Sequence, residues 1–285
     1  MAEFENRFWS SRDGLKLHYR DYPGREDRPP LLCLPGLTRN ARDFAALAAR
    51  HAGEWRVICP DLRGRGDSDW AKDAASYNPL QYVEDVELLL GALGLEWIVA
   101  VGTSLGGLMT AILSLKHPGL VAGAVLGDIG PVIEEAGLAR IRGYVGQGRA
   151  FATWMHAARA LEESQAVSYP GYSLDDWLAM AKRVMTVGSN GRIVFDYDMK
   201  IAEPFEQAKD APPLDLWPAF ESLGGRPLLC VRGALSDILS AETLVAMMAR
   251  LPGLETLTVP GVGHAPTLDE PEACEAVGRL LGRIG

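Results

Sequence analysis

Short apolar runs alternate with amphipathic stretches over the first 130 residues of the chain. After an alternating hairpin at 8–22, four continuous apolar runs are typical of strands buried on both faces. They read PLLCLPG at 30–36, WRVICPD at 55–61, WIVAVG at 97–102 and LVAGAVLGD at 120–128. Helical patterns at about 41–51, at 80–93 and directly after residue 104 separate them. This spacing predicts an α/β fold, with a mostly parallel central sheet and helices on both faces.

The alternation stops at Gly130-Pro131, and only amphipathic helical stretches follow as far as about Pro218. They lie at 134–147, 150–163 and 174–187, and Ser173 with Asp176 predicts the N-terminal cap of the last one. Strand and helix patterns then resume, with strands at 226–233 and 254–261 and helices at 240–250 and 270–283. The pattern therefore predicts an α/β core formed by residues 1–130 and 219–285, interrupted by a helical insertion at 131–218.

Composition and charge exclude several classes of function. The 285 residues are 48% hydrophobic, enough for a sizeable core, but no window approaches the roughly 18 apolar residues of a membrane-spanning helix. Lys and Arg number 28 against 37 Asp and Glu, and the resulting net charge of −9 disfavours binding to a nucleic-acid backbone. The polar, acidic N-terminus lacks the basic and apolar regions of a signal peptide, so we expect a cytoplasmic protein.

The four cysteines stand alone in the sequence, without any CxxC pair. Cys33, Cys59 and Cys230 lie within apolar runs, whereas Cys274 lies in the last helical pattern. Because free cysteine is among the most buried residue types, we expect core packing and neither a disulfide framework nor a zinc site.

The segment Gly102-Thr103-Ser104-Leu105-Gly106 matches G-x-S-x-G directly after a buried strand and at the start of a helix. That context is the one a nucleophile elbow requires, because the tight turn needs small residues two positions from the serine. The turn would hold the Ser104 hydroxyl at a helix N-terminus, where negative charge is stabilised.

Five motifs in a fixed order resemble those of the α/β-hydrolase fold family, over essentially the whole chain. They are LPGLTRN at 34–40, DLRGRGDSD at 61–69, VGTSLGG at 101–107, RGALSD at 232–237 and VPGVGHAP at 259–266. Within the family, the chain is similar to cap-bearing esterases, lactonases and C–C bond hydrolases. The resemblance implies that the insertion is a cap over Ser104, whose Trp, Tyr, Met and Phe residues either enclose an apolar substrate or join the cap helices to one another.

The resemblance also implies a catalytic triad. Of the five histidines, only His264 lies in a Gly-rich loop after a strand, where the family places its general base. Two aspartates compete for the role of the acid that orients the histidine. Most family members keep it where Asp237 stands, so we favour Asp237. A minority keep it where Asp128 stands, and Asp128 remains the alternative.

The oxyanion hole implied by the family consists of two backbone N–H groups. One belongs to Leu105, which follows the serine, and we expect the other at Leu37. In the turn that carries Leu37, family members usually have His-Gly, whereas this chain has Pro35-Gly36. This difference leaves the conformation of the turn, and with it the second donor, less defined. Arg39 and Asn40 follow this turn, and the sequence does not distinguish solvated loop residues from contacts to a polar substrate group.

These observations predict a serine-dependent hydrolase of small to medium, largely apolar carboxylic esters, lactones or thioesters. We expect a small-molecule substrate and no cofactor or metal, nucleic acid or membrane, while monomer and homodimer remain open. A C–C bond hydrolase of ring-cleavage products is the alternative within the same chemistry. A cofactor-free lyase or perhydrolase, and a ligand-binding receptor with little turnover, are the remaining alternatives.

Overall fold

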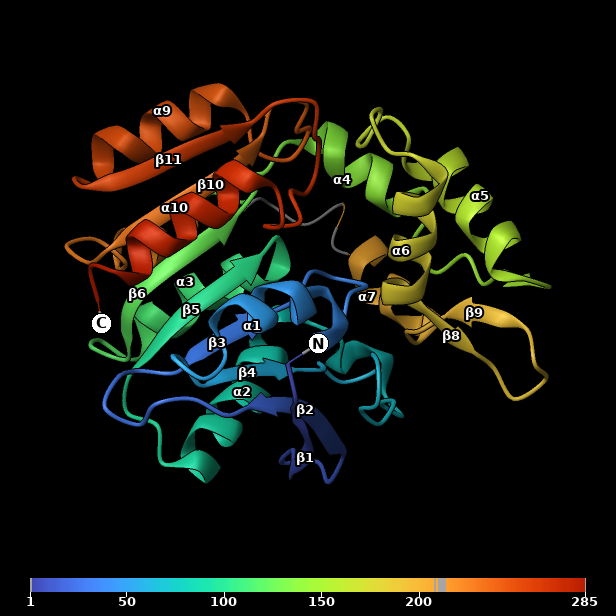
Figure 1. The fold of residues 1–285 in the computed structure, drawn as a ribbon, viewed down its shortest axis with the longest axis horizontal. Coiled ribbons are helices and arrows are strands. Elements are labelled where there is room, and N and C mark those ends of the chain that lie inside the picture. The colour runs from blue at the N-terminus through green and yellow to red at the C-terminus, as the bar shows by residue number, and fades with distance from the viewer. Residues whose placement is uncertain (1, 208, 210–213, 285) are drawn as a thin grey trace.

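A twisted eight-stranded sheet forms the centre of the computed structural model, which describes residues 2–284 except 208 and 210–213 (Figure 1). The strand order is β1-β2-β4-β3-β5-β6-β10-β11, and the pairs from β4 to β11 are parallel, whereas β1-β2 and β2-β4 are antiparallel. The strands are β1 (Glu5–Ser10), β2 (Lys16–Tyr22), β3 (Leu31–Leu34), β4 (Val57–Pro60), β5 (Ile98–Thr103), β6 (Val121–Gly127), β10 (Leu228–Gly233) and β11 (Leu254–Val259). The predicted α/β class and the mostly parallel sheet are confirmed.

Helices cover both faces of this sheet, and each face has its own core. Helices α2 (Pro79–Leu93), α3 (Leu105–Lys116), α8 (Trp217–Glu221) and α9 (Ala241–Arg250) contribute buried side chains to one core. Helices α1 (Ala45–His51) and α10 (Pro271–Leu281) contribute to the other, together with the 3₁₀ turn η1 (Ala41–Phe44). A second 3₁₀ turn, η2 (Ala74–Ser76), precedes α2. Cys33, Cys59 and Cys230 are buried in the central strands and unpaired, as core packing predicts.

The segment between β6 and α8 lies to one side of the sheet, at the carboxyl ends of β6 and β10 (Figure 1). It has a core of its own, built mainly from α5 and α6. Its elements are α4 (Glu135–Arg142), β7 (Ala150–Phe151), α5 (Trp154–Gln165), α6 (Leu174–Val184), β8 (Met185–Val187), β9 (Ile193–Phe195), η3 (Met199–Ile201) and α7 (Ala202–Gln207). Strands β7, β9 and β8 form a small antiparallel sheet, so the insertion is not purely helical as predicted. Strands of two or three residues are too short to produce a recognisable alternation.

The start of α6 was predicted correctly from the sequence. Ser173 and Asp176 form a reciprocal capping box, in which the Ser173 N–H donates to Asp176 Oδ2 at 2.8 Å and the Ser173 hydroxyl accepts from the Asp176 N–H. The helix ends at Val184, and Met185 to Val187 continue as β8. Within the described residues, no helix is long and apolar enough to cross a membrane.

We predict that Ser173→Ala lowers the free energy of unfolding by about 1 kcal/mol, because it leaves an N-terminal N–H of α6 without its acceptor. Urea unfolding followed by circular dichroism measures the change. Ser173→Thr keeps the hydroxyl and is the matched control. Equal stability of the alanine variant and the wild type would show that the cap does not stabilise α6.

Candidate active site

Ser104 sits in the tight turn between β5 and α3, with φ 53° and ψ −117°. This positive φ is strained for a residue with a side chain. The turn closes only because its neighbours are glycines: a Cβ on Gly102 would overlap the carbonyl oxygen of Gly106, and one on Gly106 would overlap that of Leu34. The helix N-terminus predicted at Ser104 is therefore present, and the serine hydroxyl stands at the carboxyl end of the central strand.

His264 lies in the loop between β11 and α10 and contacts two of the predicted site residues. Its Nε2 is 2.8 Å from Ser104 Oγ, and its Nδ1 is 2.7 Å from Asp128 Oδ2. Because a carboxylate only accepts hydrogen bonds, Nδ1 carries the proton and Nε2 is free to accept from the Ser104 hydroxyl. The structure thus joins Ser104, His264 and Asp128 in a continuous hydrogen-bonded chain.

The preference for Asp237 as the partner of His264 is wrong in this geometry. Asp237 is in the loop after β10, but both of its carboxylate oxygens accept hydrogen bonds from Arg140 of α4, at 2.6 and 2.8 Å. This hydrogen-bonded pairing, together with the positive charge of Arg140, holds the pKa of Asp237 below its usual range. Asp237 therefore links the insertion to the sheet, and Asp128, the alternative, occupies the position beside the imidazole.

Asp128 is held by donors from the strand beside it. It follows β6 directly, is fully buried, and adopts a positive φ of 54° that aspartate tolerates better than most residues. The Gly233 N–H donates to its Oδ1 at 2.8 Å, and the Ser236 hydroxyl donates to its Oδ2 at 2.6 Å. With His264 as a third donor, the carboxylate is hydrogen-bonded on both oxygens, which offsets the cost of burying its charge.

The backbone N–H groups of Leu105 and Leu37 are the candidate oxyanion donors. Within the described residues, neither the Leu105 N–H nor the Leu37 N–H donates a hydrogen bond. The turn carrying Leu37 is fixed by Arg65, a fully buried side chain whose Nε and Nη2 donate to the Leu37 carbonyl oxygen at 2.9 and 2.7 Å. Arg65 also donates to the Arg63 carbonyl oxygen at 2.6 Å. The Leu37 carbonyl belongs to the peptide unit that follows the one carrying the Leu37 N–H, so Arg65 fixes the chain on the C-terminal side of this candidate donor.

The insertion holds the histidine loop in place. The Tyr169 hydroxyl donates to the Ala265 carbonyl oxygen at 2.8 Å and accepts from the Ala265 N–H at 3.1 Å. The Gly263 N–H donates to the Ser168 carbonyl oxygen at 2.6 Å. Both neighbours of His264 are therefore bonded to the segment after α5, so the position of the imidazole depends on the insertion.

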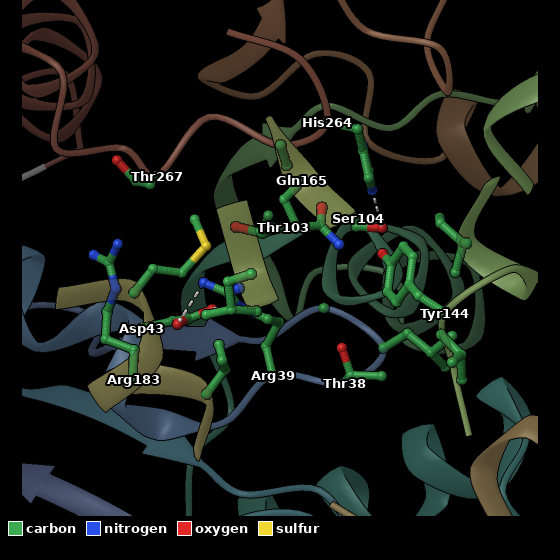
Figure 2. A pocket seen from close by; sticks show the side chains of 18 of the residues that line it. Thr38, Arg39, Asp43, Thr103, Ser104, Tyr144, Gln165, Arg183, His264 and Thr267 are labelled. Atoms are coloured by element: carbon green, nitrogen blue, oxygen red, sulfur yellow. Dashed lines mark hydrogen bonds and ion pairs between the residues drawn. The ribbon is translucent and has the colours of Figure 1, made fainter. Parts of the chain in front are cut away.

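A cavity of about 130 Å³ opens beside Ser104, between the sheet and the insertion (Figure 2). Part of its wall is apolar. The aromatic and methionine residues of the insertion that line it are Tyr144, Tyr169, Met180, Phe195 and Tyr197. Trp177, by contrast, is buried in the core of the insertion and packs edge-on against Tyr169. The insertion therefore both encloses the cavity and packs against itself.

The polar part of the cavity wall includes Arg39, Asp43, Gln165 and Arg183. Arg39 donates to both carboxylate oxygens of Asp43, from Nε and from Nη2, the latter at 2.9 Å. Burial alone would lower the pKa of the Arg39 guanidinium, but the Asp43 charge raises it above its ordinary value. Asn40, in contrast, has a structural role, because it caps η1 and donates to the Arg183 carbonyl oxygen at 3.1 Å.

One group among the described residues has the spacing of a metal site: His18, Asp61 and Asp67. His18 and Asp61 already have partners within the protein, whereas the Asp67 side chain is exposed, with Oδ2 4.0 Å from His18 Nδ1. His18 Nδ1 lies 2.6 Å from Asp61 Oδ2, which also accepts from the Asp67 N–H at 3.1 Å, while Asp61 Oδ1 accepts from the Ala41 N–H at 2.7 Å. The arrangement braces the turn after β4.

Sequence reasoning missed four residues that position the site: Arg65, Arg140, Tyr169 and Ser236. Arg65 lies in the DLRGRGDSD motif. Its place in a Gly-rich turn after a buried strand was the one feature of the sequence that could have indicated a structural role. The other three act across segments 96 to 108 residues apart in the chain.

Comparison with known proteins identifies the family of this fold. A family model described as the alpha/beta hydrolase fold matches residues 29–271. The chain belongs to this family. Among solved structures, an alpha/beta hydrolase from Novosphingobium aromaticivorans DSM 12444 superposes on this one with a TM-score of 0.96 and 60% identity, over the full length of both chains.

Two curated relatives of this alpha/beta hydrolase carry functional names. The 3-hydroxybutyrate-oligomer hydrolase of Cupriavidus necator is 35% identical over 263 residues, covering 90% of this chain and 89% of the relative. The 2-(acetamidomethylene)succinate hydrolase of Mesorhizobium japonicum is 30% identical over 247 residues, covering 86% and 84%. The family and these names support hydrolase activity.

We predict that a fluorophosphonate labels wild-type protein and Asp237→Asn at rates within about threefold of each other, and labels Asp128→Asn about 10³- to 10⁴-fold more slowly. Only Asp128 orients the imidazole that activates the Ser104 hydroxyl. Intact-protein mass spectrometry measures the rates, with Ser104→Ala as the unlabelled control. Slow labelling of Asp237→Asn beside rapid labelling of Asp128→Asn would reverse the assignment.

Proposed function

We propose that this alpha/beta hydrolase is a serine-dependent hydrolase of small carboxylic esters, acting through an acyl-enzyme. The observation that carries the proposal is the hydrogen-bonded chain from Ser104 through His264 to Asp128, beside an enclosed cavity. A free serine hydroxyl is a weak nucleophile, and a base at hydrogen-bond distance removes its proton as it attacks.

The first half of the proposed reaction forms the acyl-enzyme. Ser104 Oγ attacks the ester carbonyl carbon while His264 Nε2 takes the hydroxyl proton, and the resulting imidazolium is stabilised by Asp128. The oxygen on which negative charge develops accepts hydrogen bonds from the Leu105 and Leu37 N–H groups, each worth about 2.7–4 kcal/mol in such sites. His264 then returns the proton to the departing alcohol oxygen.

The second half of the reaction restores the enzyme. A water molecule gives a proton to His264 Nε2 and attacks the acyl carbon. As the second tetrahedral intermediate collapses, His264 returns this proton to Ser104 Oγ, which releases the acid and restores the free hydroxyl. Every proton transfer passes through His264 Nε2, so the proposed reaction needs the side chains and backbone N–H groups named above and one water molecule.

The substrate class follows from the cavity and from one relative. The name of the Cupriavidus necator relative specifies 3-hydroxybutyrate oligomers, whose units are joined by ester bonds. A cavity of about 130 Å³ with a partly apolar wall suits a short ester better than a long polymer strand. We therefore propose short-chain esters, including those of small hydroxy acids, as substrates.

We predict that wild-type protein hydrolyses p-nitrophenyl butyrate and that Ser104→Ala lowers kcat by at least about 10³-fold, because it removes the nucleophile. Release of p-nitrophenolate measures the rate, and circular dichroism checks the fold of the variant. Equal rates for the two proteins would contradict the mechanism. Labelling of Ser104 without turnover of any ester would favour a C–C bond substrate, and failure of both would favour a ligand-binding receptor.

Arg65 provides a test of the oxyanion hole. We predict that Arg65→Lys lowers kcat by about 10- to 100-fold with little change in KM, because one ammonium group cannot reproduce the planar fork that holds the Leu37 carbonyl. Steady-state kinetics with p-nitrophenyl butyrate separates the two parameters. An increase in KM alone would show that Arg65 acts on substrate binding instead.

A further inference from the structure

Arg39 is a cationic side chain beside the oxyanion turn and, unlike Arg65, it lines the cavity. A methyl group on Gly36 would lie 3.3 Å from Arg39 Cγ and 3.7 Å from Ser104 Cβ, so the two side chains flank the same glycine. Both line the cavity, and Figure 2 shows the Arg39 guanidinium joined to Asp43 within it. The proposed ester chemistry has no role for this charge.

The hydrogen bonds of Arg39 leave one edge of its guanidinium available. Asp43 occupies the side formed by Nε and Nη2. Within the described part of the chain, Nη1 donates no hydrogen bond to another residue. A guanidinium has five N–H donors in one plane. The edge formed by Nη1 and the second proton of Nη2 can therefore still donate two hydrogen bonds to one anion.

The charges on the cavity wall favour a negative ligand. Apart from His264, the charged lining residues are Arg39, Arg183 and Asp43. The Arg183 Nε is buried without a hydrogen-bond partner, and Nη1 of the same side chain is 3.6 Å from Asp269, which also pairs with Arg50. The cavity lining therefore contains two arginines and one carboxylate. That carboxylate, Asp43, is already paired with Arg39.

We propose that Arg39 binds a carboxylate of the substrate, so that the enzyme acts preferentially on esters carrying a free carboxylate a few atoms from the scissile bond. This inference rests on the proposed ester hydrolysis and specifies its substrate class. Asp43 holds the guanidinium in place, and the incoming carboxylate binds the opposite edge. Since the carboxylate is not one of the reacting groups and its charge does not change during the reaction, this contact contributes about equally to the bound substrate and the transition state and is expressed mainly in KM.

Matched anionic and neutral esters test the proposal. Mono-p-nitrophenyl adipate and methyl p-nitrophenyl adipate differ only in a carboxylate on the acyl side. On the alcohol side, 4-(butanoyloxy)butanoate and its terminal amide differ in the same way. We expect wild-type protein to prefer the anionic member of at least one pair by about 10- to 100-fold in kcat/KM, the range of a hydrogen bond to a charged group.

Three variants separate binding from structural support. Arg39→Met should remove the preference, mainly by raising KM for the anionic ester, with a much smaller effect on the neutral one. Asp43→Asn breaks the same ion pair but keeps the cation, so it should retain the preference. Arg159→Met, an exposed charge on α5, should match the wild type. Equal losses on both esters in Arg39→Met would show that the ion pair only supports the fold.

A binding measurement keeps the proposal testable without turnover. Calorimetry on Ser104→Ala should show tighter binding of the anionic ester than of its neutral partner, and this difference should vanish in Ser104→Ala with Arg39→Met. Absence of the difference in both pairs overturns the carboxylate proposal. Ser104-dependent hydrolysis of p-nitrophenyl butyrate would then leave the proposed function intact, whereas anion binding without any ester hydrolysis would overturn the proposed function alone.

Discussion

The position of one buried carboxylate organises the rest of the site. Asp128 is fully buried, and an ionised carboxylate there is tolerated only if several donors converge on it. Gly233 and Ser236 supply two of them from β10 and the loop after it, and His264 supplies the third from the loop after β11. Three segments more than 100 residues away from Asp128 in the chain must therefore pack correctly before the imidazole can point at Ser104, which couples the geometry of the site to the completion of the sheet.

The core of the fold could be predicted because its signals are local. Continuous apolar runs identified the central strands, and G-x-S-x-G after one of them located Ser104, since the tight turn excludes side chains at Gly102 and Gly106. His264 was identified by its Gly-rich loop and by the family's motif order. The capping box at Ser173 was equally local and was confirmed. In each case, residues within a few positions of one another determine the structure.

The predictions that failed depend on contacts between distant segments. Nothing near Asp237 in sequence indicates that Arg140 of the insertion takes both of its carboxylate oxygens, and nothing near Asp128 indicates that Ser236 stabilises it. The small sheet of the insertion was missed because its strands are too short to show a period. These same long-range contacts give the insertion its second role: through Tyr169 and Arg140 it braces the loops around His264 while it encloses the cavity.

The most direct test of this account is a crystal structure of the protein with Ser104 phosphonylated, because the adduct resembles the tetrahedral intermediate. The account predicts the phosphoryl oxygen within about 2.7–3.1 Å of the Leu37 and Leu105 N–H groups, with His264 Nδ1 still bonded to Asp128. An oxygen directed away from these two groups, or an imidazole turned toward Asp237, would contradict it.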